Sequence, residues 1–131
     1  MLNSLHIENI AIIDSLDVDF GKGFSVLTGE TGAGKSIIID SIQLLVGNKA
    51  SKDLIRTGAD AAIVSACFSG LSDEAIALLD ENGLSPDPEG NIIIFRKIGV
   101  DGRNNARING INVTVSLLKQ LGEQLINIHG H

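Results

Sequence analysis

The chain has 131 residues, of which 44% are hydrophobic and 20% are charged, and this composition is typical of one globular domain with a real core. The formal net charge of −6 argues against strong non-specific binding of nucleic acid by the surface as a whole, although a local basic patch stays possible. The single cysteine, Cys67, cannot form an internal disulfide, and we interpret it as a small buried hydrophobic residue in a reducing compartment. Without a long apolar run or a signal segment, we expect a cytoplasmic chain with no membrane partner.

Elements in the first half of the chain follow from the spacing of apolar residues. Alternation predicts two half-exposed strands, around residues 5–8 and 16–20. An apolar run at 24–28 predicts a buried strand that enters a glycine-rich loop. Residues 37–46 predict the helix that leaves this loop, with Gly47 as its C-terminal cap.

The second half of the chain predicts further strands and helices after a polar loop at 48–60. We expect a strand at 62–68, a helix that begins after Ser72 and ends at Gly83, and a strand at 92–98. The Asn109-Gly110 pair predicts a type I′ turn in a hairpin at 106–113. A short helix at 116–121 and an apolar strand at 125–128 follow.

A glycine-rich octamer follows the run at 24–28 and matches the phosphate-binding pattern G-x-x-x-x-G-K-[ST]. Its residues are Gly29, Glu30, Thr31, Gly32, Ala33, Gly34, Lys35 and Ser36. Glycines let successive backbone amides face phosphate oxygens, Lys35 reaches the β- and γ-phosphates, and the Ser36 hydroxyl is a ligand for Mg²⁺. The alternative is a glycine-rich turn before a basic helix start. The strand–loop–helix order favours a nucleotide site.

Four cations, Arg96, Lys97, Arg103 and Arg107, lie in a segment whose one counter-charge is Asp101. Such a basic hairpin could contact the DNA backbone. A solvated charged face is the alternative, because exposed charges need no function.

The order of the elements and several short segments carry a family resemblance. Two half-exposed strands precede the phosphate loop, as in ATP-binding-cassette (ABC) proteins and in the head domains of chromosome-maintenance (SMC) type ATPases. The segments at 5–13, 28–36, 54–59, 107–110 and 126–130 resemble the N-terminal part of the RecN family of bacterial DNA-repair proteins. The resemblance runs from residue 1 to the end of the chain.

This resemblance implies an α/β P-loop NTPase of ABC/SMC head type, whose N-terminal lobe has a mixed sheet and an antiparallel β portion. Residues 1–131 would be the N-terminal half of the head, before a coiled coil. ATP and Mg²⁺ are the implied cofactors, and the partners are the C-terminal half of the head, a second head and DNA at double-strand breaks. The implied location is the cytoplasm, at the nucleoid. The signature motif and the acidic motif for hydrolysis are missing from the chain, so we expect it to be inactive alone.

Two departures accompany the resemblance. The family leads us to expect glutamine near Mg²⁺ where this chain has His131, and imidazole is a poor magnesium ligand. His131 is therefore either a residue from a chain junction or tag, or a replacement; we expect His129 to serve packing, and His6 has no functional case. Without tyrosine or tryptophan, base recognition would use aliphatic contacts around residues 10–13. The alternative functions are a nucleotide-dependent interaction module and a transporter-type motor.

Overall fold

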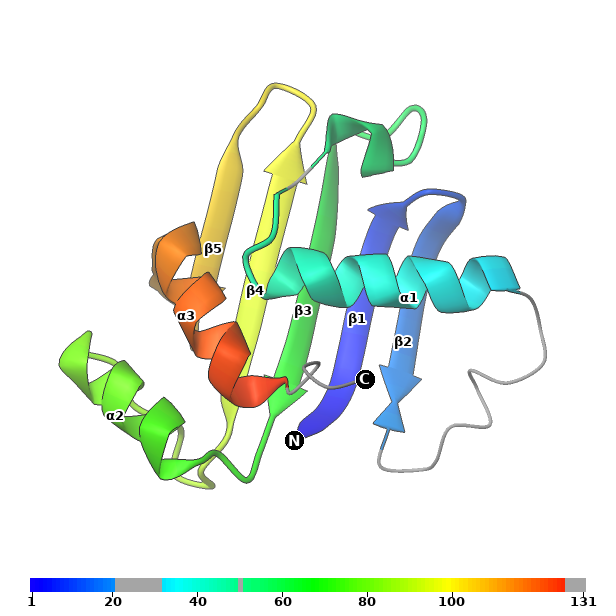
Figure 1. Cartoon of the computed structure of the whole chain (residues 1–131). Coiled ribbons are helices and arrows are strands. Elements are labelled where there is room, and N and C mark those ends of the chain that lie inside the picture. The colour runs from blue at the N-terminus through cyan, green and yellow to red at the C-terminus, as the bar shows by residue number, and fades with distance from the viewer. Residues whose placement is uncertain (21–31, 50, 127–131) are drawn as a thin grey trace.

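The computed structural model describes residues 1–20, 32–49 and 51–126. Its strands form one sheet in the order β2-β1-β3-β4-β5-β6, and helices cover one face of it (Figure 1). Each pair of neighbouring strands in this sheet is antiparallel. The strands are β1 (Leu2–Ile10), β2 (Ile13–Asp19), β3 (Ala61–Phe68), β4 (Ile92–Gly99), β5 (Asn104–Ile108) and β6 (Ile111–Asn112).

The two faces of the sheet differ in the side chains that they carry. Alternate positions of each strand point to the same face, and the apolar set lies under the helices. The buried members of this set include Leu5, Ile7, Val18, Ala62, Val64, Ala66, Phe68, Ile92, Ile94, Ile98, Ala106 and Ile108. The opposite set forms the face without helices, which we call the open face. Cys67 belongs to the open face and is half-buried, so the prediction of a buried cysteine is wrong.

Helix α1 (Gly32–Leu45) lies across the sheet and packs on β1, β3 and β4 (Figure 1). It begins five residues before the predicted start, because the second half of the glycine-rich octamer forms its first turn. Gly47 ends the helix, as predicted. Its amide donates to the Leu44 carbonyl and the Asn48 amide to the Gln43 carbonyl, which is a Schellman cap. The strand expected at 24–28 lies outside the described residues.

Two further α-helices complete the covered face. Helix α2 (Asp73–Glu81) begins as predicted, with the Ser72 hydroxyl accepting from the Ala75 amide. Helix α3 (Val115–Leu125) packs beside α2 and is longer than predicted, and Leu125 ends it instead of starting a strand. The loop after α1 contains the short 3-10 helix η2 (Lys52–Leu54), which the sequence did not predict.

The β5–β6 hairpin confirms the predicted turn. Ile108 pairs with Ile111, so the loop has two residues, and both have positive φ angles, 49° at Asn109 and 83° at Gly110. A type I′ turn requires this conformation at both positions. The antiparallel part of the predicted lobe is therefore present.

Candidate nucleotide-binding site

The predicted phosphate site lies at the amino end of α1. Gly29, Glu30 and Thr31 lie outside the described residues. Gly32, Ala33, Gly34 and Lys35 form the first turn of the helix. Ser36 follows with an exposed side chain. The structure therefore brings the second half of the octamer to a helix N-terminus, where free amides and the helix dipole favour an anion.

The charge of this first turn also suits an anion. No acidic residue occurs in the first turn of α1, whereas Asp73 and Glu74 occupy the first turn of α2. Carboxylates near a helix N-terminus stabilise the helix and would repel phosphate there. The amino end of α1 thus lacks the stabilising acids that α2 has, as expected for a helix end that receives a ligand's negative charge.

The carboxyl end of α1 receives a buried cation from β4. The Arg96 side chain is 1% exposed, and its Nη1 donates to the carbonyl oxygens of Leu44, at 2.6 Å, and Asn48, at 2.9 Å. Its Nε donates to Oδ1 of Asn104 at 3.2 Å. Burial lowers the pKa of this guanidinium below its usual value. Arg96 is therefore part of the core under α1.

This position corrects the prediction of one surface patch made by Arg96, Lys97, Arg103 and Arg107. Arg96 has the same strand parity as Ile94 and Ile98, which are buried on the helix-covered face. Lys97 points to the open face and is exposed. The sequence contained this signal, because alternation along 92–98 places every second residue on the apolar face.

The other three cations stay at the surface. Lys97 and Arg107 lie on the open face, on the paired strands β4 and β5. Arg107 lies over the Phe95 ring, with 5.3 Å from the guanidinium carbon to the ring centroid. Arg103 is in the turn between these strands, and its Nε lies 3.4 Å from Oδ2 of Asp101. The structure thus keeps a smaller basic region on one edge of the open face.

Beside α1, a hollow of about 330 Å³ is lined by the cation Lys49. Asp40 of α1 and Asp53 of η2 line the same hollow. The positive charge of Lys49 therefore has acidic residues near it, and this region is not a purely basic surface.

The residues expected to contact the nucleotide base, 10–13, lie at the turn between β1 and β2. Ile10 is fully buried, so it cannot contact a base, whereas Ile12 is 82% exposed. The Ala11 amide donates to the Leu54 carbonyl at 2.8 Å, and the backbone of Ala11 has a φ of 53°. Only the exposed part of the predicted aliphatic surface is available to a ligand.

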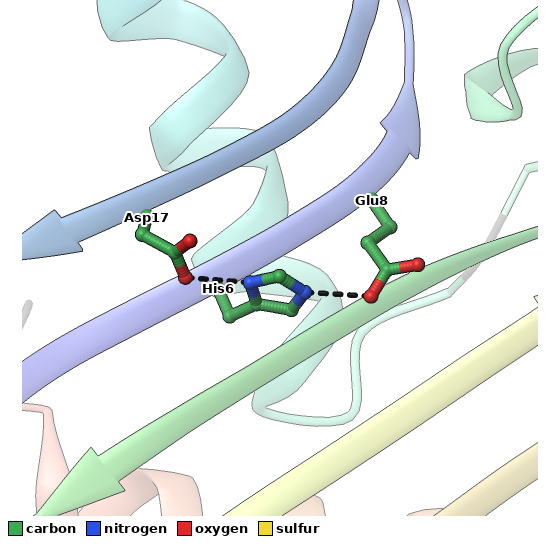
Figure 2. A network of polar contacts seen from close by, with 3 residues as sticks. All are labelled: His6, Glu8 and Asp17. Atoms are coloured by element: carbon green, nitrogen blue, oxygen red, sulfur yellow. Dashed lines mark hydrogen bonds and ion pairs between the residues drawn. The ribbon is translucent and has the colours of Figure 1, made fainter.

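His6 lies in a polar network on the open face. Figure 2 shows its ring between Asp17 and Glu8, with 2.6 Å from Nδ1 to Asp17 Oδ1 and 2.6 Å from Nε2 to Glu8 Oε2. The hydrogen bonds to Glu8 and then Asp17 raise the pKa of His6. Sequence analysis missed this network, because Asp17 is a neighbour of His6 only through the strand register.

None of the helices in the described ranges is long and apolar enough to cross a membrane.

Comparison with protein families assigns this arrangement to a class. The family model described as an AAA domain matches residues 4–128. The chain belongs to this AAA domain family. The fold, with a sheet under a helix that starts in a phosphate-binding motif, agrees with that assignment.

Curated relatives narrow the similarity further. The chain is 46% identical over 132 residues to the DNA repair protein RecN of Vibrio cholerae serotype O1. It is 43% identical over 131 residues to the DNA repair protein RecN of Bacillus subtilis. Each alignment covers 99% of this chain and 23% of the relative, so the chain spans about a quarter of the length of these relatives.

Among solved structures, one described as "Structural biochemistry of ATP-driven dimerization and DNA stimulated activation of SMC ATPases" shares the fold. The TM-score is 0.73 at 23% identity, over 99% of this chain and 84% of that one. The predicted ABC/SMC head fold is confirmed by this likeness.

Proposed function

We propose that this chain is the ATP-binding half of a DNA-repair ATPase head, as its similarity to RecN proteins suggests. The observation that carries the proposal is that α1 begins inside the octamer G-x-x-x-x-G-K-[ST] with no acid in its first turn. A transporter-type motor is not favoured, because the relatives are DNA repair proteins and the shared fold is that of an SMC ATPase.

The residues of this chain would bind the triphosphate end of ATP. Free amides at the start of α1 donate hydrogen bonds to phosphate oxygens, and the helix dipole adds favourable charge. The Lys35 ammonium neutralises the β- and γ-phosphates, which offsets its own unfavourable position at the positive end of a helix. These groups bind and neutralise phosphate.

Magnesium fits the same helix end. The exposed Ser36 hydroxyl is the oxygen donor that the motif supplies, and Mg²⁺ takes oxygen ligands with retained waters. When bound, the ion neutralises charge that develops on the phosphates. We assign the metal site to Ser36, with further ligands from phosphate and water.

Hydrolysis requires parts that this sequence does not contain. The resemblance places the activating acid in the C-terminal half of the head and the signature motif on a second head. We propose the C-terminal half of the head and a second head as partners, with residues 1–131 as one half-domain. We place the complete protein in the cytoplasm. The chain alone is then expected to release no phosphate from ATP above a Lys35→Ala control. Sustained turnover by the purified chain would contradict this assignment.

DNA is the third proposed partner. We propose that Lys97, Arg103 and Arg107 contact the phosphate backbone from the edge of the open face, where two of them extend from adjacent strands. Phosphate contacts of this kind carry no sequence information. Arg96 is excluded from this role by its burial.

The direct test of ATP binding uses the Lys35→Ala variant. Because Lys35 supplies charge to the phosphates, the substitution should lower Mg·ATP affinity at least about a hundredfold, which corresponds to roughly 2.7 kcal/mol. Isothermal titration calorimetry of both forms gives the affinities. Circular dichroism checks that the variant is folded. Equal affinity in a folded variant would refute the site.

A further inference from the structure

Arg96 has no acidic partner for its charge in the part of the chain that the structure describes. The ion pairs found there join His6 to Glu8 and Asp17, and Arg103 to Asp101. Arg96 is instead bonded to two main-chain carbonyls and one side-chain amide oxygen. A buried cation is costly unless its surroundings compensate the charge. The compensating groups here belong mainly to the end of one helix.

The carbonyls that bind Arg96 lie at the carboxyl end of α1 and in the cap that follows it. Leu44 lies in the last turn of the helix, and Asn48 is the residue after the Gly47 cap. The Leu44 carbonyl belongs to the negative end of the helix dipole, which favours a cation, and the Asn48 carbonyl lies just past that end. The two bonds cross 52 and 48 residues of sequence, so they tie β4 directly to α1.

The opposite end of α1 is the predicted phosphate site. The helix has 14 residues and is therefore roughly 20 Å long, so Arg96 does not contact a nucleotide. Coulomb attraction falls with distance, so direct attraction between Arg96 and phosphate is a minor effect at this separation. A helix is stiff, however, and fixing one end limits where the other end lies.

From these contacts we infer that Arg96 is a positioning residue for the phosphate site. By holding the carboxyl end of α1 on β4, it sets the placement of α1 over the sheet and so the orientation of the amides in its first turn. This inference rests on the proposed function, and it assigns Arg96 a role in nucleotide affinity that its burial alone would not require.

Asn104 supports this arrangement from β5. Its Oδ1 accepts from Arg96 Nε, so it orients the planar guanidinium while Nη1 bonds to the helix. Lysine at position 96 would keep the charge and lose this fork of donors. Arg96→Lys keeps the charge and Arg96→Met removes it, so comparison of these two variants separates the effect of charge from the effect of geometry.

The test compares Mg·ATP affinity with stability in four variants of the 131-residue chain. Arg96→Met should lower the melting temperature and should also lower the affinity for Mg·ATP about tenfold. The affinity is measured by calorimetry well below the melting temperature. Arg96→Lys should recover only part of the affinity. The control Leu79→Ala removes a buried side chain from α2, and it should lower the melting temperature while wild-type affinity remains. Asn104→Ala keeps Arg96 and should lower the affinity for Mg·ATP about twofold to threefold. This variant gives a result even if Arg96→Met does not fold.

A second readout does not depend on ATP. In ¹H–¹⁵N spectra, Arg96→Met or Asn104→Ala should shift the amide signals of residues 32–36, and Leu79→Ala should not. Wild-type affinity and unshifted amides in folded Arg96→Met, or in Asn104→Ala, would overturn the positioning role. Wild-type affinity for Mg·ATP in Arg96→Lys would also overturn the positioning role, because charge alone would then explain the effect of residue 96. Absence of ATP binding by the wild type would instead refute the proposed function, and the amide shifts would still decide the role of Arg96.

Discussion

Arg96 and Lys97 are neighbours in the chain, yet β4 sends them to opposite faces of the sheet. Arg96 is buried and bonded to the end of α1, whereas Lys97 is exposed on the open face. The same contrast holds for the two faces as a whole. The covered face holds the core and fixes α1, and the open face carries a polar network and surface cations. The role of a charged residue on this sheet therefore depends on the face to which its position in the strand directs it.

The covered face should be the less tolerant of substitution, and Gly47 gives the largest expected effect. Its φ is +89°, and a Cβ at this position would lie 2.8 Å from the Lys119 amide nitrogen and 2.8 Å from the Val115 carbonyl oxygen of α3. Gly47→Ala adds backbone strain to a clash with the main chain, so it should lower the free energy of unfolding by about 2–5 kcal/mol. Urea denaturation measures this value.

Gly83 provides the matched control for that experiment. It has a φ of +73°, and within the described residues no atom of another part of the chain lies within 4 Å of a Cβ built there. Gly83→Ala should therefore cost only the strain, about 1–2 kcal/mol. An equal loss in both variants would mean that the close approach of α3 does not constrain the end of α1.

The cations of the open face should affect binding and leave stability nearly unchanged. Replacing Lys97, Arg103 and Arg107 together by glutamine in the complete protein should lower the affinity for duplex DNA about tenfold to a hundredfold at low salt. It should also reduce the slope of log K against log salt by roughly three. Fluorescence anisotropy across a salt series measures both. ATP affinity should stay at the wild-type value.

Lys119 is the control cation for DNA binding. It is exposed on α3, on the helix-covered side of the sheet, so Lys119→Gln should leave the salt slope unchanged. If the triple variant also keeps the wild-type slope, these residues are a solvated face and the DNA site lies in other parts of the protein.

The smallest expected effect concerns His6 on the open face. Glu8 and Asp17 raise its pKa, so the protonated ring stabilises the fold. Asp19 and Cys67 also face His6, in a hollow of about 300 Å³ on the open face. This stabilisation is fully present below pH 6.5, the unfolded value, and is lost as the pH rises through the raised pKa of His6. The pairs are partly exposed, so the change should not exceed about 1 kcal/mol.

Chemical denaturation of wild type and His6→Gln between pH 5.5 and pH 8.5, a range set around the reference histidine pKa of about 6.5, tests this effect. The difference in unfolding free energy between the two forms should shrink as the pH rises. A constant difference over this range would show that the ring contributes through neutral hydrogen bonds.

Much of the fold could be predicted because the signals are local. Apolar residues along 62–68 and 92–98 predicted both strands, Ser72 marked the start of α2, and Asn109-Gly110 predicted the hairpin turn. These features depend on backbone preferences within a few residues. The helix around 116–121 was predicted too short because no cap or glycine marks its end, and Leu125 reads equally well as strand or helix.

The sequence by itself determined the chemistry of the candidate site. The octamer at 29–36 predicts phosphate binding because glycines, a lysine and a hydroxyl must occur at fixed spacing for amides and charge to meet phosphate. Only the tertiary structure decided which charges support that site. Arg96 meets Leu44 and Asn48 through packing of β4 under α1, and Gly47 meets α3 in the same way. Such contacts join residues far apart in the chain, and local pattern carries no information about distance across the core.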